Sequence, residues 1–285
     1  MYAQKELETM CRWLAYSGSP ILLEDVLYKP DHSLIDQSMH ARMGVETFNA
    51  DGFGVGWYAG RTTAARYRSV APAWSDRNLR EISGHVTSPL FLAHIRASTG
   101  TAVQQTNCHP FRHGPWLWVH NGLIRDFHTV KRDLMLAVDP ALFADIEGET
   151  DSELMLHLAL TFGLDSDPPT AVERMVGFVE DVGRRHDIDH PIQMTVGTTN
   201  GEAVWAFRYS SEHASRTLFF SSAVAGLRRL YPDSPVIRGV SDDTRLVVSE
   251  PLGDLPGVWN EVPESSYGVV HKGHDSLHAF RPQAP

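Results

Sequence analysis

The first residue that could do chemistry is a cysteine that directly follows a methionine, Cys11 after Met10. If the chain is cut after Met10, or begins there and loses it, Cys11 carries both a thiol and a free α-amino group. An α-amine has a pKa of roughly 7.7–8.0, so it can take up the thiol proton near neutral pH. A nucleophile activated by its own amine is a known form of covalent catalysis. From this segment alone, Cys11 could also be a buried cysteine on an edge strand.

Further polar groups follow predicted strands or open a predicted helix. Arg96 and Thr99 follow one strand. The Asn121-Gly122 pair follows a second strand, and Asp151 opens a helix. Because elements that end at one edge of a sheet lie close together, we expect one pocket to hold these groups. Their chemistry suits an amino acid: a guanidinium binds a carboxylate, a carboxylate receives an α-ammonium, and a side-chain amide with a backbone N–H can form an oxyanion hole.

Each of these residues also has a purely structural interpretation. Asp151 at a helix start could only complement the helix dipole, and Asn121-Gly122 could only be a turn. Arg96 could be a surface ion-pair partner, although an arginine that ends so apolar a strand is less often incidental. The second cysteine, Cys108, is predicted to fill a small space behind the site and to take no part in catalysis.

Four histidines invite a metal interpretation: His94, His109, His113 and His120. Their spacing matches no compact zinc pattern, and no pair of thiols accompanies them. We therefore predict neither a metal site nor another cofactor. His120 is instead predicted to be a hydrogen-bonded core residue.

The order of the predicted elements indicates an α+β fold. Strands are predicted at 10–16, 91–96, 116–120, 193–196, 203–207, 218–221 and 246–249, with extended segments at 258–259 and 267–270, and helices at 19–27, 75–85, 126–138, from 150 onward and at 169–185. The segment 49–58 alternates glycines with apolar residues, which suggests a strand that another backbone approaches closely. Thr150 followed by Glu153 is a capping-box signature. Strands alternating with helices in this way are typical of sheets packed with helices.

Charge, cysteine content and hydropathy exclude several classes of protein. The net charge of -10 disfavours a nucleic-acid partner. Only two cysteines stand among 285 residues, which rules out a disulfide scaffold and suits a reducing cytoplasm. Residues 1–10 lack the apolar core of a signal peptide, and no apolar run is long enough to span a membrane.

Six short motifs occur in one order over about half of the chain. They are Met10-Cys11, Asp51-Gly52, His94-Ile95-Arg96-Ala97-Ser98-Thr99-Gly100, Asn107-Cys108-His109-Pro110-Phe111, His120-Asn121-Gly122 and Gly148-Glu149-Thr150-Asp151-Ser152-Glu153. Each motif alone is weak, but together they resemble the class II glutamine amidotransferases, the N-terminal nucleophile group. The resemblance is closer to stand-alone members of this size, which include relatives that hydrolyse γ-glutamyl bonds in glutathione breakdown and ergothioneine synthesis.

The resemblance implies a four-layer α-β-β-α sandwich of the N-terminal nucleophile hydrolase type. It implies that Cys11 is the nucleophile and, through its amine, the base, while Asn121 and Gly122 form the oxyanion hole. The expected reaction is cleavage of the amide of glutamine, or of a γ-glutamyl compound, through a thioester on Cys11.

The resemblance also assigns the binding of the small-molecule substrate. Arg96, with help from Thr99, would hold the substrate carboxylate, and Asp151 would hold its ammonium group. These residues read only the amino-acid end of the substrate, so the leaving group stays open.

The domain organisation is predicted from the same alignment of motifs. Residues 1–10 would be a leader, a propeptide or a mis-assigned start, and residues 11–285 a single amidotransferase domain. No second domain with a nucleotide or phosphosugar signature is visible, so transfer of ammonia would need a partner synthase subunit, and otherwise the protein hydrolyses its substrate. One alternative is a non-catalytic binding or regulatory module that keeps the fold, favoured if residues 1–10 stay attached. A papain-like protease lacks any local signature near Cys11.

Overall fold

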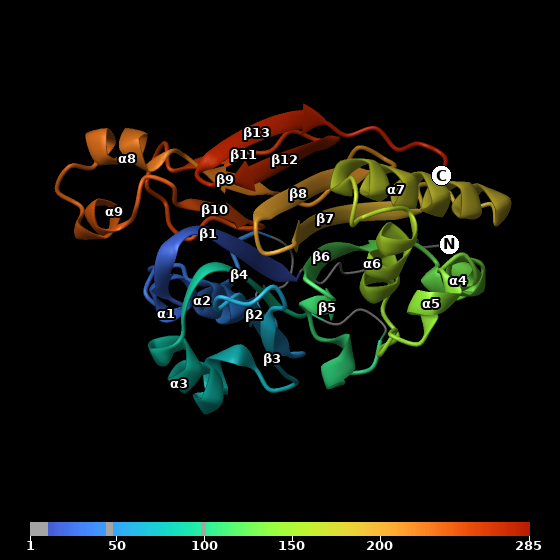
Figure 1. Ribbon diagram of the computed structural model, residues 1–285, viewed down its shortest axis with the longest axis horizontal. Helices are drawn as coiled ribbons and strands as arrows, with labels where there is room; N and C mark the ends of the chain where they lie inside the picture. The colour runs from blue at the N-terminus through green and yellow to red at the C-terminus, as the bar shows by residue number, and fades with distance from the viewer. Residues whose placement is uncertain (1–10, 44–47, 98–100) are drawn as a thin grey trace, which may run out of the picture.

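Two antiparallel sheets stack face to face in the computed structural model, which describes residues 11–43, 48–97 and 101–285 (Figure 1). Within these ranges the first sheet has seven strands in the order β11-β9-β10-β1-β4-β2-β3, and the second has six in the order β13-β12-β8-β7-β6-β5. The first sheet comprises β1 (Arg12–Leu22), β2 (Phe53–Trp57), β3 (Ala65–Ser69), β4 (Thr87–Ile95), β9 (Phe219–Ser221), β10 (Arg245–Val248) and β11 (Trp259–Glu261). The second comprises β5 (Phe111–His113), β6 (Trp116–Ile124), β7 (Ile192–Thr199), β8 (Ala203–Ser210), β12 (Ser266–His271) and β13 (His274–Ala279).

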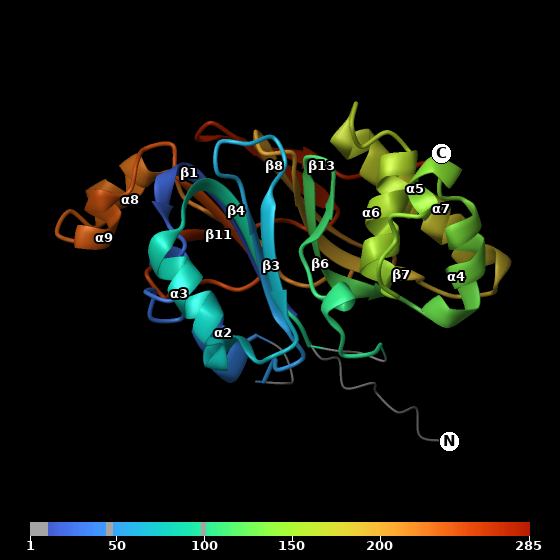
Figure 2. The same ribbon diagram turned by 60° about the horizontal axis from the view of Figure 1, so that its bottom comes forward.

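Helices cover the outer face of each sheet (Figure 2). The α-helices are α1 (Glu24–Leu27), α2 (Leu34–His40), α3 (Arg77–His85), α4 (Phe127–Leu136), α5 (Pro140–Phe143), α6 (Asp151–Thr161), α7 (Pro168–Arg185), α8 (Val224–Leu230) and α9 (Pro235–Gly239), and two short 3-10 turns are η1 (Ala73–Ser75) and η2 (Gln105–Asn107). In Figure 2, α2 and α3 lie on the side of the first sheet, and α4, α6 and α7 lie on the side of the second. Helices α8 and α9 project beyond one end of the first sheet.

Three buried apolar clusters hold the layers together. Between the sheets, Trp13 and Leu92 of the first sheet meet Leu117 and Val119 of the second. A second cluster joins the first sheet to α1, α2 and α3, and a third joins the second sheet to α4, α6 and α7. Burial of apolar surface at about 25 cal/mol per Å² makes these interfaces the main source of stability. The predicted four-layer α-β-β-α sandwich is confirmed.

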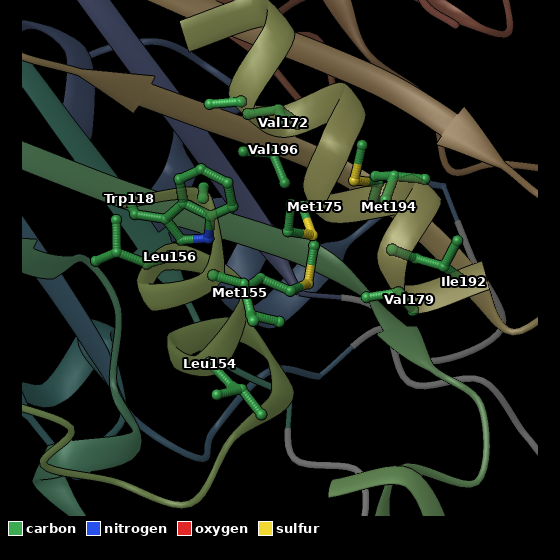
Figure 3. Packing of buried hydrophobic residues seen from close by; sticks show 14 of the residues in the cluster. Trp118, Leu154, Met155, Leu156, Val172, Met175, Val179, Ile192, Met194 and Val196 are labelled. Carbon is green, nitrogen blue, oxygen red and sulfur yellow. The ribbon is translucent and has the colours of Figure 1, made fainter. Parts of the chain in front are cut away.

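The third cluster shows why the longest helices lie on the second sheet. Helix α7 repeats apolar residues at helical spacing, so one stripe of the helix is buried. Figure 3 shows Met155 of α6 and Met175 of α7 next to each other, with Trp118 of β6 and with Met194 and Val196 of β7 around them. The unbranched methionines fill the irregular space between two helices and a sheet.

The prediction of a close backbone approach at 49–58 is confirmed. Gly54 lies on β2, and a Cβ atom added there would stand 2.2 Å from the carbonyl oxygen of His109. Only glycine therefore fits where the segment before β5 crosses the strand. This crossing brings His109 of the second sheet's side against His94 of the first, with ring centroids 3.9 Å apart.

Three boundaries predicted from the sequence are wrong. The helix predicted at Ser19-Pro20 does not begin there, because β1 continues to Leu22. Pro20 is accommodated because the pairing of β1 with β4 shifts register between Ser17 and Ile21, where the missing N–H breaks no regular ladder. The helix predicted from residue 75 begins at Arg77 instead, because Asp76 is its cap and accepts through Oδ1 from the Leu79 amide at 2.8 Å.

The third wrong boundary lies at the end of the strand predicted for 116–120. The Asn121-Gly122 pair does not stop this strand, because β6 runs on to Ile124 and stays paired with β7 along residues 192–199. The pair therefore lies within a strand that is hydrogen-bonded to its neighbour on both sides of the pair. Strands β3, β5 and β13 and helices α5, α8 and α9 were not predicted, since all are short and β13 is exposed throughout.

Within the described residues, no helix is long and apolar enough to cross a membrane.

Candidate active site

Cys11 stands directly before β1, in the middle of the first sheet. Strand β1 pairs with β10 on one side and with β4 on the other, so the interpretation of Cys11 as an edge-strand residue is wrong. Its thiol is partly buried, and its Sγ accepts a hydrogen bond from the main-chain amide of Ala97 at 3.3 Å. The sulfur is thus held at the end of β4, next to Arg96.

The surroundings of Cys11 favour a protonated thiol. Burial raises the pKa of the thiol above its usual value, and the carboxylate of Asp151 acts in the same direction. The Ala97 amide and the guanidinium groups of Arg96 and Arg12 oppose this shift without reversing it. A nucleophilic thiolate at this position therefore requires a base.

Asn121 holds the main chain of Cys11. Its side chain is buried, and its Nδ2 donates to the carbonyl oxygen of Cys11 at 2.9 Å. An amide carries two N–H donors, so this bond leaves a second one for another acceptor. Because the pair lies inside β6, the interpretation of Asn121-Gly122 as a turn is wrong.

Gly122 must be glycine for two reasons. Its φ is +147°, a backbone conformation that residues with a side chain rarely adopt. A Cβ atom added there would stand 2.0 Å from the carbonyl oxygen of Gln193 and 2.8 Å from Nε2 of His120. The absence of a side chain keeps the backbone of Gly122 open to the pocket that it lines.

Arg96 is buried, so the interpretation of it as a surface ion-pair partner is wrong. Its guanidinium donates to the carbonyl oxygens of Asp51 and Ala102 at 3.4 and 3.2 Å and to Oγ1 of Thr101 at 2.5 Å. These bonds fix the cation at the wall of the pocket. Thr99, predicted to assist Arg96, lies outside the described residues, and the role expected for it stays a prediction.

Asp151 is the first residue of α6 and faces the same pocket. Its Oδ2 accepts from the Ile124 amide at 2.8 Å, and its Oδ1 accepts from the Ser152 amide at 2.7 Å. The carboxylate thus supports the first turn of the helix, as the structural interpretation predicted. The predicted capping box is half confirmed: Thr150 Oγ1 accepts from the Glu153 amide at 3.2 Å, but Glu153 itself binds the amides of residues 147 and 148.

One pocket of about 120 Å³ brings most of these groups together. It is lined by Cys11, Arg96, Ala97, Thr101, His109, His120, Gly122, Leu123, Ile124, Phe127, Thr150, Asp151 and Ser152. Among the predicted site residues, Asn121 contacts the pocket through the carbonyl of Cys11. The pocket therefore offers a sulfur, a cation and an anion within one small concave site.

Three buried histidines form the back of the pocket. Nδ1 of His120 lies 2.8 Å from Oγ of Ser152, and Nε2 of His94 lies 3.1 Å from the carbonyl oxygen of His120. His120 is thus a hydrogen-bonded core residue, as predicted. Burial lowers the pKa of His94 to about 3 and also lowers the pKa of His109 and of His120. All three rings are neutral at neutral pH.

Among the described residues, no group of three histidine, cysteine, aspartate or glutamate side chains could hold a metal ion. The buried Cys108 packs where a Cβ atom of Gly52 would stand, 2.6 Å from its Sγ. It fills a small space behind the site, as predicted, and does not line the pocket.

Sequence reasoning missed the apolar wall and one polar link of the site. Leu123, Ile124 and Phe127 line the pocket because β6 continues past Gly122, which the predicted turn concealed. The hydroxyl of Ser152 donates to Asp151 at 3.1 Å and reaches His120, connecting the carboxylate to the buried ring. Its place in the second position of the predicted helix was the available signal.

The fold and the pocket define a class of protein, and comparison with known proteins gives the family. The model of the family "Glutamine amidotransferases class-II" matches residues 28–282. The chain belongs to this family, and it is an enzyme that acts on the amide of a small molecule of the glutamine or γ-glutamyl kind. The predicted enzyme class is confirmed, and the alternative of a non-catalytic module is not favoured.

Individual relatives agree with this family. The chain is 31% identical over 299 residues to "Probable glutamine amidotransferase DUG3" of Saccharomyces cerevisiae, covering 94% of this chain and 84% of that protein. It is 28% identical to "Gamma-glutamyl-hercynylcysteine sulfoxide hydrolase" of Mycolicibacterium smegmatis, covering 93% and 97%. The solved structure of a glutamine aminotransferase class-II domain protein from Silicibacter pomeroyi superposes with a TM-score of 0.71 at 29% identity, covering 95% and 100%.

Proposed function

We propose that the protein is an N-terminal cysteine amidohydrolase that cleaves glutamine or a γ-glutamyl compound through a thioester on Cys11. The observation that carries this proposal is the common pocket of Cys11, Arg96, Gly122 and Asp151. A nucleophile, a cation and an anion on one small pocket match the side-chain amide, the carboxylate and the ammonium of a glutamine-like substrate.

Activation of the nucleophile explains why residues 1–10 would have to be absent from the mature enzyme. Burial raises the pKa of the Cys11 thiol, and the three histidines behind the pocket have lowered pKa values, which makes them weak bases. A free α-amine on Cys11 would supply the missing base. We therefore propose residues 11–285 as the mature catalytic domain.

The reaction balances with the groups of the pocket alone. The α-amine takes the thiol proton, and Sγ of Cys11 forms a bond to the amide carbon, whose oxygen becomes an oxyanion. The second N–H of Asn121 and the N–H of Gly122 stabilise this oxyanion. Its collapse breaks the C–N bond, and the leaving amine receives the proton. Water then attacks the thioester, releases the acid product and restores the thiol.

The two charged residues would hold the part of the substrate that does not react. Arg96 lies at the wall of the pocket, oriented by three oxygen acceptors, and its planar guanidinium has the geometry that binds a carboxylate. Oδ1 of Asp151 accepts from the amide and the hydroxyl of Ser152, and Oδ2 accepts only from the Ile124 amide among the described residues, so that a carboxylate oxygen has a lone pair for an ammonium. Thr99 is proposed to assist Arg96.

The leaving group is the least determined part of the substrate. One relative is named as a γ-glutamyl-hercynylcysteine sulfoxide hydrolase and another as a probable glutamine amidotransferase, which supports both γ-glutamyl compounds and glutamine. We propose hydrolysis as the default outcome, with transfer of ammonia only in complex with a synthase partner. We also propose the cytoplasm as its location, supported by a catalytic thiol that must stay reduced.

Release of glutamate from glutamine and from γ-glutamyl peptides tests the proposal. Purified mature protein should release glutamate, and Cys11→Ala should release none. Cys108→Ala is the matched control, since this thiol is buried outside the pocket and should leave turnover intact. N-terminal sequencing should begin at Cys11. Turnover by Cys11→Ala, or by protein that still carries Met1, would overturn the assignment of nucleophile or of base.

A further inference from the structure

A buried carboxylate at the end of β10 gathers donors from three distant parts of the chain. Glu250 is 1% exposed. Its Oε2 accepts from Nε of Arg12 at 2.7 Å and from the Met43 amide at 3.1 Å. Its Oε1 accepts from the Arg42 amide at 2.8 Å and lies 2.6 Å from Nε2 of His32. The carboxylate thus has four partners, one from the residue after Cys11 and three from residues 32–43.

The guanidinium that Glu250 binds belongs to the residue directly after Cys11. Besides the bond to Glu250, Nη1 of Arg12 donates to the carbonyl oxygen of Cys11 at 3.0 Å, and Nη2 donates to the carbonyl oxygen of Met43. The carbonyl of Cys11 therefore receives two donors, Arg12 on one side and Asn121 on the other.

Burying this ion pair has a desolvation cost, which suggests a role beyond packing. Arg12 is 1% exposed, and removing a charged pair from water costs several kcal/mol that apolar residues of similar volume would not cost. The planar fork of Arg12 binds three oxygens in three directions, which a lysine ammonium on a flexible stem cannot reproduce. These three bonds of Arg12 hold the main chain of Cys11 in one position.

We propose that Arg12, oriented by Glu250, is a positioning residue that fixes the main chain of Cys11 so that its thiol and its α-amine both face the substrate. This inference rests on the proposed function, because it presumes an N-terminal nucleophile. In addition, the guanidinium places a positive charge 3.0 Å from the carbonyl oxygen of the residue that would carry the α-amine. A neighbouring cation disfavours the protonated amine, so the amine stays available as a base near neutral pH.

The other charged and titratable groups around Cys11 and Arg12 come from every neighbouring element. They are Glu250 after β10, His32 and Asp36 at the start of α2, Arg96 after β4, Asp151 at the start of α6, and His109 and His120 at the back of the pocket. Glu250 partly offsets the charge of Arg12, and its removal should strengthen the effect of the cation on the amine.

The test compares Arg12→Lys, Arg12→Gln and Glu250→Gln in the mature full-length enzyme. Arg12→Lys keeps the charge but loses the fork, so kcat should fall on the order of 100-fold while KM stays within about 2-fold. The acidic limb of the kcat/KM profile should move to higher pH in Arg12→Gln, which loses the cation. It should move to lower pH in Glu250→Gln, which unmasks the cation. A merely structural role would not move the limb in opposite directions.

Arg245→Lys is the matched control. Arg245 is also a buried arginine of the first sheet, with its Nε 2.8 Å from Oδ1 of Asp275, and it lies at the far end of β10, opposite Ser17. Its kcat and pH profile should match those of the wild type. If Arg12→Gln does not fold, Arg12→Lys and Glu250→Gln still decide the matter.

The two proposals fail in different ways. Wild-type kcat and an unmoved acidic limb in folded Arg12→Lys and Glu250→Gln proteins, with Cys11→Ala inactive, would overturn the positioning role alone. Turnover by Cys11→Ala would overturn the proposed function itself.

Discussion

The side-chain amide of Asn121 donates to the main-chain carbonyl of Cys11 at 2.9 Å, across 110 positions of the sequence. The bond joins β6 of the second sheet to the start of β1 in the first. The residue proposed to stabilise the oxyanion therefore also fixes the nucleophile, which couples the two halves of the sandwich at the reacting centre.

Replacing Asn121 should damage catalysis more than folding. Asn121→Ala removes one oxyanion donor and one donor to Cys11, so kcat should fall on the order of 100- to 1,000-fold. The loss of one buried hydrogen bond should cost about 1 kcal/mol of stability. Steady-state kinetics and a urea titration measure the two effects separately.

Gln193→Ala provides the comparison for Asn121. Gln193 is a buried amide on the adjacent strand β7 and does not line the pocket. Its Nε2 donates to the Ala214 carbonyl oxygen over a distance of 2.6 Å. It should lose similar stability and keep its kcat. Equal kcat losses in both variants would mean that Asn121 acts only through folding.

The charged residues of the pocket should act on substrate binding and orientation. Removing either Arg96 or Asp151 leaves one end of the substrate unpaired in a partly desolvated site, at a cost of roughly 2–5 kcal/mol. At about 1.4 kcal/mol per tenfold, kcat/KM should fall on the order of 30- to 3,000-fold when either charge is removed, as in Asp151→Asn, and Arg96→Lys should not rescue activity fully. An ammonium cannot replace the planar fork.

Thermal melts separate this effect from a loss of fold. Asp151→Asn keeps the acceptor for the Ser152 amide but loses the acceptor for the Ile124 amide, so its Tm should fall modestly. Asp167→Asn alters the cap of α7 in the same way, outside the pocket, and should leave kcat/KM unchanged. Wild-type kinetics in folded Arg96→Lys and Asp151→Asn would show that these two residues do not bind the charged groups of the substrate.

The buried histidines should make the folded protein sensitive to mild acid. In the unfolded chain they protonate near the usual pKa of 6.5, but in the folded protein burial holds the pKa of His94 at about 3 and those of His109 and His120 below 6.5. The unfolded state therefore binds more protons, and stability falls as the pH drops below 6.5. Between about pH 7 and about pH 5.5 the loss from His94 alone should be about 1 kcal/mol, and His109 and His120 should add to it in the same direction.

Melts as a function of pH measure this loss, and His94→Gln should reduce its slope. Glu250 cannot cause it: its pKa lies below its usual 4.5 in the folded protein, so its contribution is present above 4.5 and is lost only as the pH falls further. A Tm that stays constant down to about pH 5 would contradict the neutral state of the rings.

The close crossing at Gly54 should not accept a side chain. Gly54→Ala would force a Cβ atom into the His109 carbonyl, 2.2 Å away, so it should destabilise the protein by about 3 kcal/mol or more. Gly226→Ala is the control, because nothing lies within 4 Å of its added Cβ in helix α8. It should stabilise by up to about 1 kcal/mol. Denaturant titrations of both variants give the comparison.

The sequence predicted the class of fold and most of the site because both depend on local signals. The apolar run of β4 and the helical periodicity of α7 predict these elements from the sequence alone. The motif around Arg96 and the helix start at Asp151 carry their chemistry within a few residues. These groups were expected in one pocket because each follows a predicted strand or opens a predicted helix, and such positions lie close together at the edge of a sheet.

What the sequence could not show depends on partners that are distant in the chain. Nothing near Glu250 indicates that it binds Arg12, 238 positions away. The continuation of β6 through Asn121-Gly122 is set by pairing with β7, which overrides the local turn preference of Asn-Gly. Pro20 fits in β1 only because the register shifts there.

The central claim is that Cys11, with its own α-amine, is the nucleophile, and a covalent trap tests it most directly. A diazoketone or chloroketone analogue of glutamine should alkylate one sulfur, with loss of dinitrogen or chloride. Peptide mass mapping of the mature protein is predicted to find one adduct, on a peptide that begins at Cys11. An adduct on Cys108, or none in protein that turns over substrate, would contradict the account.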